Sequence, residues 1–182
     1  SIRYADESLK KFFVAAEKEP WFQNTLFIVT ADHTSKNYLP DYENEISKYR
    51  VPIIFYHPTY RWPAVDQQQI AQHIDILPTL LDFLNISPKE KIWLGRSLFV
   101  PGERTATTFV EGRYMLLAHD FLLDWSLGQD VRIYSSRDLQ QKNPVDPPVE
   151  RKTELQNRLK ASIQYFTEGM WDNRLYYPRP GL

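Results

Sequence analysis

The chain has 182 residues, which is enough for one domain with a hydrophobic core and short for two. Its 22 basic and 23 acidic residues give a formal net charge of −1, which removes any electrostatic argument for binding nucleic acid. It contains no cysteine, so disulfides, thiolate metal sites and cysteine nucleophiles are excluded.

The first third of the chain has the pattern of a helix, a strand, a loop and a second strand. Apolar residues at helical spacing over 2–18 predict an amphipathic helix. The β-branched run TLFIVT at 25–30 predicts a strand buried on both faces, as in a parallel sheet. Residues 35–48 are polar and predict a long loop, and YRVPIIFY at 49–56 predicts a second strand. Pro52 near its start indicates that the first residues of that strand lie at an edge of the sheet or outside the ladder.

The rest of the chain predicts one helix, a small sheet and a last helix. Residues 69–74 are expected to be extended, and a helix is expected over 76–84 with Asp75 as its N-cap. An amphipathic helix is expected over 149–171. The turn signals Gly112 and Gly128 lie among short apolar runs that predict an antiparallel meander. Its strands are expected over 107–111, 113–119, 121–127 and 131–135.

Asp32 and His33 directly follow the first predicted strand, and they are the strongest candidates for chemistry. Neighbouring side chains of a strand point to opposite faces, so the two can share an ion only where the backbone leaves the strand. The polar residues that follow permit this. A carboxylate with an imidazole suits Zn or Mn, but a metal site needs three or four ligands. The alternative is an ordinary strand end that caps the next turn.

His57 and Arg96 are weaker candidates. His57 ends the second strand, at what we expect to be the same edge of the sheet, and a structural histidine is the alternative. Arg96 lies in GRSL at 95–98, and a guanidinium binds phosphate or sulfate in a bidentate fork. The alternative for Arg96 is a surface turn. The hydroxyl residues beside His33 lack the motif of a nucleophile elbow.

The order of these motifs resembles that of the alkaline phosphatase and sulfatase superfamily. The Asp-His pair after an apolar strand is followed by VPIIFY, IDILPTLL, GRSL and RIYSSRD, which begin at residues 51, 74, 95 and 132. Sulfatases usually have glycine after this pair, whereas Thr34 stands here. The chain therefore looks most like the lipoteichoic acid synthase-type phosphoglycerol transferases.

The resemblance implies an α/β fold class. It implies a partial alkaline phosphatase-like sheet with flanking helices over 1–106, and over 107–182 a small antiparallel meander and terminal helix of the same domain. It also implies a divalent metal ion (Mn, Zn, Mg or Ca) held in part by Asp32 and His33. His57 and Arg96 would then contact an anionic ester substrate, either a small molecule or one linked to lipid or glycan.

The superfamily's nucleophile and first acidic metal ligand match no position in this sequence. The resemblance therefore implies the C-terminal part of a catalytic domain, which is inactive alone and needs the N-terminal part of its own chain as partner. The implied reaction is metal-dependent phosphoryl transfer on phosphodiesters, outside the cytoplasm, in a parent anchored to the membrane. A sulfatase is one alternative. A non-catalytic binding domain with a vestigial Asp32–His33 pair is another.

Overall fold

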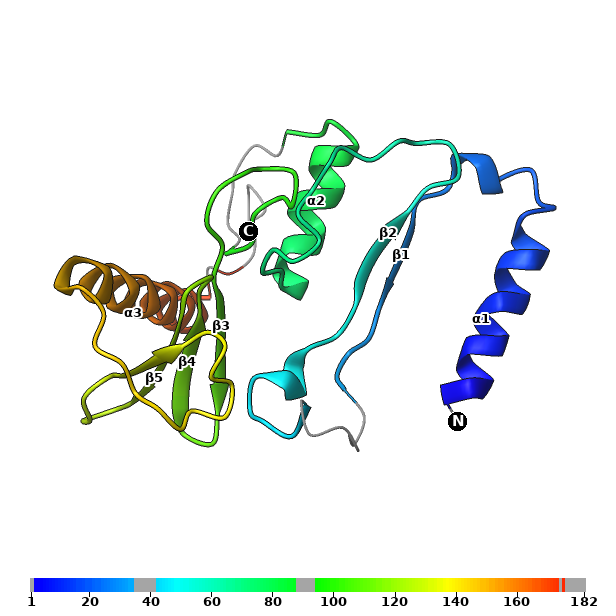
Figure 1. Cartoon of the computed structure of the whole chain (residues 1–182). Helices are drawn as coiled ribbons and strands as arrows, with labels where there is room; N and C mark the ends of the chain where they lie inside the picture. The colour runs from blue at the N-terminus through cyan, green and yellow to red at the C-terminus, as the bar shows by residue number, and fades with distance from the viewer. Residues whose placement is uncertain (1, 35–41, 88–93, 174, 176–182) are drawn as a thin grey trace. The chain divides into compact units, whose positions relative to one another are not determined.

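The structure is a computed structural model that describes residues 2–34, 42–87, 94–173 and 175. The chain forms two compact units, one of residues 1–34 with 50–64 and one of residues 35–49 with 65–182. Elements carry the labels of Figure 1. No helix among the described residues is long and apolar enough to cross a membrane.

The first unit joins one helix to two strands through aromatic rings. α1 (Ile2–Ala16) precedes a 3₁₀ helix, η1 (Phe22–Asn24), and then β1 (Phe27–Thr30). After the loop the chain returns as β2 (Ile53–Tyr56). The ring of Phe13 lies 5.1 Å from that of Phe27 and 5.7 Å from that of Tyr56. The helix is therefore fixed to both strands by ring packing.

β1 and β2 pair antiparallel, with Thr30 opposite Ile53 and Phe27 opposite Tyr56 (Figure 1). The prediction of a parallel strand buried on both faces is wrong for this pair, because the apolar residues of β1 are only half-buried in the described chain. The position of Pro52 before the ladder is confirmed, as expected for a residue without an N–H donor. The expected start of the strand at residue 49 is wrong, since Ser47–Tyr49 form a 3₁₀ helix, η3.

The second unit contains the predicted meander. Its strands pair antiparallel with their sequence neighbours. They are β3 (Ala106–Val110), β4 (Arg113–Leu117), β5 (Phe121–Ser126) and β6 (Arg132–Ser135). Glu111 and Gly112 join β3 to β4 with φ of 50° and 79°. Two such residues make the tight hairpin turn whose twist matches that of the strands.

The meander has a hydrophobic cluster on each face. α3 (Val149–Trp171) has the predicted bounds and covers one face with the buried residues Leu155 and Leu159 (Figure 1). Those leucines pack with residues at alternate positions of the central strands, including Leu116 and Leu123. The other face buries Met115, Leu122 and Tyr134, with Ile46 packed against them.

α2 (Ile76–Phe83) begins as predicted directly after Asp75, but part of the stretch expected to be extended is helical. His73–Asp75 form a 3₁₀ helix, η4, which leads into α2. The division of the chain into 1–106 and 107–182 stays a prediction. The small sheet starts at Ala106, close to the expected point.

Candidate functional site

Asp32 and His33 lie at a bend after β1, which ends at Thr30. Asp32 Oδ1 accepts a hydrogen bond of 2.8 Å from the His33 amide, and Asp32 Oδ2 lies 3.4 Å from His33 Nε2. The two side chains are 85% and 76% exposed, in that order. The backbone therefore leaves the strand at this point, and both side chains turn to one side, which is the condition for sharing an ion.

The proton position on His33 fits a metal ligand. Nδ1 lies 2.8 Å from the Thr34 carbonyl oxygen, which only accepts hydrogen bonds, so Nδ1 carries the proton. In the neutral ring Nε2 then carries a lone pair, and this atom faces the carboxylate of Asp32. Two acceptors at this distance can share one cation or one proton. Their separation also equals that of two ligands each about 2.1 Å from one tetrahedral ion. In metal-ligating histidines, the ring nitrogen that does not bind the metal typically donates a hydrogen bond to a carbonyl or carboxylate oxygen.

The pair does not make a complete site among the described residues. No group of three His, Cys, Asp or Glu side chains in that part of the chain could hold a metal ion. A catalytic zinc-type site needs three protein ligands, so Asp32 and His33 supply part of a coordination shell.

His57 lies at the other end of the strand pair. Thr30 pairs with Ile53 and Phe27 with Tyr56, so His57 follows the end opposite to Asp32. The expectation of a shared edge rested on parallel strands and is wrong. His57 Nδ1 accepts hydrogen bonds from the amides of Thr59 and Tyr60, at 3.3 and 3.1 Å, and so orders the turn after β2. Its contact with substrate stays a prediction.

The motifs IDILPTLL and GRSL fold together around the buried side chain of Asp75. One carboxylate oxygen accepts a hydrogen bond from the Arg96 amide at 2.8 Å, and the other accepts from the Gln72 amide at 2.9 Å. The same second oxygen lies 3.0 Å from Arg104 Nη2, and both side chains of that ion pair are 6% exposed. Asp75 therefore holds the 95–98 loop against α2 with its carboxylate.

Two hydroxyl groups complete this junction. Thr79 donates to the Asp75 carbonyl oxygen at 2.7 Å and accepts from the Leu98 amide at 3.0 Å. Ser97 donates to the Asp82 carboxylate at 2.6 Å. The polar residues of both motifs are thus hydrogen-bonded to one another, which gives the motifs a structural reason for their spacing.

Arg96 contributes its guanidinium to the same loop. Its Nη2 donates to the carbonyl oxygens of Gly102 and Glu103, each at 3.1 Å. These bonds order the segment that leads to β3. The predicted contact of Arg96 with substrate stays a prediction.

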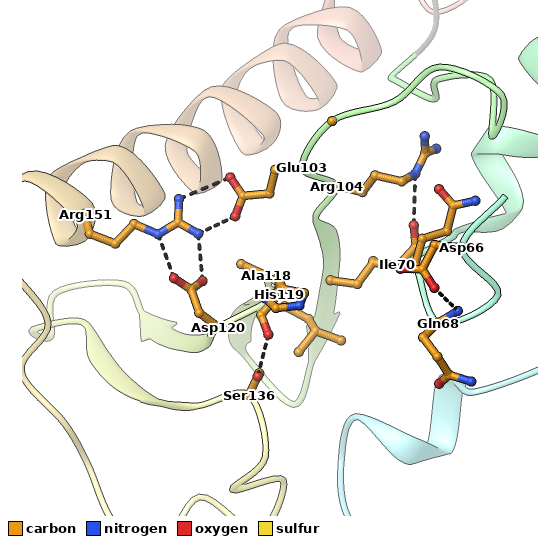
Figure 2. A pocket seen from close by; sticks show the side chains of 13 residues that line it. Asp66, Gln68, Ile70, Glu103, Arg104, Ala118, His119, Asp120, Ser136 and Arg151 are labelled. Atoms are coloured by element: carbon orange, nitrogen blue, oxygen red, sulfur yellow. Dashed lines mark hydrogen bonds and ion pairs between the residues drawn. The ribbon is translucent and has the colours of Figure 1, made fainter.

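A pocket of about 510 Å³ lies in the second unit, between the segment before β3, the start of β5 and α3. Figure 2 shows Arg151 of α3 between Glu103 and Asp120 on its rim. Arg151 Nε and Nη2 donate to Asp120 at 3.1 and 2.7 Å, and Nη1 donates to Glu103 and Glu154 at 3.1 and 2.8 Å. Nη2 also donates to Glu103.

All five N–H donors of Arg151 are thereby engaged, so its guanidinium is not free to bind an anionic ester. Burial raises the pKa of Asp120, but hydrogen bonds from Arg151 and from the backbone outweigh it and lower that pKa overall. The hydrogen bond from Arg151 also lowers the pKa of Glu154. This cluster fastens α3 to the sheet.

Sequence reasoning did not identify Arg104 or Arg151. Arg151, Glu154 and Arg158 have the three- and four-residue spacing of ion pairs on the predicted helix, and that signal could have been found. No local signal marks Arg104, because its partner Asp75 lies far away in the sequence.

Comparison with known proteins defines the class. Residues 1–86 match the family model for sulfatases. The fold matches a protein in the alkaline phosphatase superfamily from Vibrio parahaemolyticus, with a TM-score of 0.78 and 24% identity, over 97% of this chain and 42% of that one. The chain belongs to the sulfatase/alkaline phosphatase superfamily of enzymes.

Within that superfamily the chain is a distant homologue of the lipoteichoic acid synthases. It is 24% identical to lipoteichoic acid synthase 1 of Bacillus subtilis (strain 168) over 175 residues, which are 89% of this chain and 26% of that protein. It is 27% identical to the lipoteichoic acid synthase-like YvgJ of the same strain over 124 residues, 58% of this chain and 19% of that protein. The chain thus spans about a fifth to a quarter of the length of these relatives.

A second solved structure shares the fold more distantly. It is BT4656 in complex with its substrate D-glucosamine-2-N,6-O-disulfate, with a TM-score of 0.59 and 16% identity, over 92% of this chain and 40% of that one. The described residues form a mixed α/β structure with three α-helices and two antiparallel sheets. This part of the alkaline phosphatase-like fold agrees with the predicted class.

Proposed function

We propose that this chain forms part of a metal-dependent phosphoryl-transfer enzyme that acts on phosphodiesters of the phosphoglycerol type. The observation that carries the proposal is the Asp32–His33 pair, in which His33 Nε2 and a carboxylate oxygen of Asp32 lie 3.4 Å apart on one side of the bend. The homology to lipoteichoic acid synthases supports the substrate class and a location outside the cytoplasm, in a membrane-anchored protein.

In this proposal Asp32 and His33 are two of the ligands of a divalent ion. Such an ion, when bound, supplies Lewis-acid charge to a phosphoryl oxygen and lowers the pKa of an attacking hydroxyl. The Thr34 carbonyl holds the ring of His33 in the tautomer that leaves Nε2 available. The proposal takes the other ligands and the nucleophile from the N-terminal part of the same protein, so the 182-residue chain is expected to be inactive alone.

Metal binding by the 182-residue chain tests the role of the pair. We expect Mn²⁺ titration, followed by electron paramagnetic resonance, to show one weak site. His33→Ala and Asp32→Ala should each weaken that site at least about tenfold, because each removes half of the ligand set. His73→Ala is the matched control and should leave the affinity unchanged. Binding that survives both ligand substitutions would refute the assignment.

The reaction itself is tested in the whole protein that we propose to contain this chain. Turnover of bis(4-nitrophenyl) phosphate should exceed that of 4-nitrophenyl sulfate, and Asp32→Ala should lower it at least about 100-fold, since even outer-shell partners of a metal cost 10–100-fold. The isolated chain should turn over neither ester. Robust turnover by the isolated chain, lost in Asp32→Ala, would contradict the incomplete site.

A sulfatase is the second candidate, because the sulfatase family model matches residues 1–86. It predicts the opposite order of the two esters in the same assay. A non-catalytic binding domain predicts no turnover of either ester by the whole protein, and no metal that depends on Asp32 or His33.

A further inference from the structure

We infer that the second unit contains an internal hydrated site, in which ordered water joins Asp124 of the sheet to the turn at residues 44–48. Nothing in the proposed activity requires this site. It concerns how residues 44–48 are held against the sheet of the second unit.

Four buried side-chain atoms of the described residues have no hydrogen-bond partner: Glu45 Oε2, Ser47 Oγ, Asp124 Oδ1 and Gln141 Nε2. Ser47 is 0% exposed and Asp124 is 1% exposed. A buried carboxylate oxygen or hydroxyl without a partner loses its hydrogen bonds to bulk water and gains none in the protein, which costs free energy. Such groups are therefore normally hydrogen-bonded to protein atoms or to ordered water.

The strand register places Asp124 on the face of the sheet that the turn covers. Asp124 pairs with Met115 on β4 and with Arg132 on β6, so the three side chains lie in one row on one face. Ile46 packs against the cluster that contains Met115. Glu45 and Ser47 flank Ile46, so the turn that carries their unpartnered oxygens lies against the cluster on this face.

Gln141 reaches the same place through Arg113. Arg113 Nη1 donates to Asp124 Oδ2 at 2.9 Å and to Gln141 Oε1 at 3.5 Å. Arg132 donates to the same Oδ2 at 3.1 Å. Both guanidinium groups therefore serve one oxygen of Asp124 and leave Oδ1 without a donor.

The chemistry of the set favours water over a metal ion. Arg113 and Arg132 already pair with the carboxylate of Asp124, and Lys48 pairs with that of Glu45, so both carboxylates have cationic partners without a metal ion. The unpartnered atoms include acceptors and donors, and a water molecule can serve both kinds with its two to four hydrogen bonds.

The turn itself is ordered for this contact. The Ser47 amide donates to Asn44 Oδ1 at 2.9 Å, and the Tyr49 amide donates to the Ile46 carbonyl oxygen at 3.1 Å. Residues 44–48 would then be held to the sheet in two ways, by the apolar packing of Ile46 and by water-mediated hydrogen bonds of the polar groups beside it.

Ser47→Ala distinguishes a hydrated site from a dry one. Loss of a water ligand should lower Tm by about 2–4 °C, the shift that corresponds to one ordinary hydrogen bond in a chain of this size. In a dry site the substitution removes an unsatisfied hydroxyl and should leave Tm unchanged or raise it, which would overturn the proposal. Ser136→Ala is the control for hydroxyl loss at a bonded position, since Ser136 Oγ donates to the His119 carbonyl oxygen at 2.7 Å, and it should lower Tm by a similar amount.

A high-resolution crystal structure of the chain identifies the occupant. We expect a water within about 2.7–3.2 Å of Asp124 Oδ1 and of Ser47 or Gln141. A direct bond from Ser47 Oγ to Asp124 with no water would refute the proposal. An ion surrounded by oxygens at about 2.0–2.6 Å would refute it as well. In solution, exchange cross-peaks between water and the Gln141 side-chain amide give the same answer independently.

Discussion

Asp75 and Arg104 show what a single pair of residues contributes to this chain. Both side chains are almost fully buried, and their ion pair is supported by donors from the Gln72 and Arg96 amides. Arg104 is also bound to three backbone carbonyl oxygens. A buried ion pair is stabilising only when its remaining hydrogen-bonding capacity is used, and here almost all of it is used.

Arg104→Met should destabilise the chain by about 3 kcal/mol, because it leaves a buried carboxylate without its cation. The expected fall in Tm is about 6–12 °C for a chain of this length. Thermal unfolding followed by circular dichroism measures it. Arg137→Met, at an exposed position, should change Tm by about 2 °C or less. An Arg104→Met variant as stable as the wild type would contradict a structural role for the pair.

At the scale of elements, the loop 94–98 is seated on η4 and α2 by close backbone contact as well as by hydrogen bonds. A Cβ atom at Gly95 would lie 1.9 Å from the Ile74 carbonyl oxygen. Backbone cannot move aside as a flexible side chain can, so this position admits only glycine. The glycine of GRSL and the isoleucine that starts IDILPTLL are thus in contact.

Gly95→Ala should therefore separate the two motifs and destabilise the chain by at least about 1–3 kcal/mol, the ordinary cost of overpacking. The measurement is the midpoint of urea unfolding. Gly112→Asn is the matched control, since Gly112 has φ of 79°, which asparagine tolerates, and a Cβ there has no neighbour within 4 Å. Equal midpoints for Gly95→Ala and wild type would show that the contact is not tight in solution.

At the scale of the second unit, the charge cluster of Arg151 joins α3 to the segment before β3 and to the start of β5. Its stability depends on pH. Asp120 and Glu154 have pKa values in the folded chain below their ordinary values of 3.8 and 4.5. A lowered pKa contributes stability that is present above the unfolded value and is lost as the pH falls through the folded value.

The free energy that this cluster contributes should therefore be constant between pH 5 and pH 7 and should decline below about pH 4.5. Arg151→Met should lower Tm at pH 7, and the difference from the wild type should shrink as the pH is lowered toward 3. Thermal melts of both proteins across this range test the sign. A difference that grows on acidification would contradict the assignment of Arg151 as the partner of these carboxylates.

Much of the architecture could be predicted from local sequence pattern. The bounds of the helix at Val149–Trp171 and the meander from Ala106 to Ser135 agree with prediction, because periodicity and turn residues are encoded within a few positions. Asp32 and His33 could be singled out for the same reason. Their metal-binding role stays a prediction, although their geometry fits it.

The pairing of β1 with β2 could not be predicted in this way. An apolar run such as FIVT is compatible with a parallel or an antiparallel partner, and the choice depends on what covers the sheet. In the antiparallel register, His57 lies at the end of the strand pair opposite to Asp32. Predicting the wrong strand pairing therefore also gave the wrong expectation that His57 shares a site with Asp32.

The sequence by itself determined the order of the elements, the adjacent carboxylate and imidazole, and the motif order that defines the superfamily. Each of these is a property of neighbouring residues or of their order along the chain. The tertiary structure decided the antiparallel pairing of β1 with β2, the burial of Asp75 against Arg104, and the packing of Ile46 against the sheet. These depend on contacts between distant segments, whose free energy no local pattern of residues records.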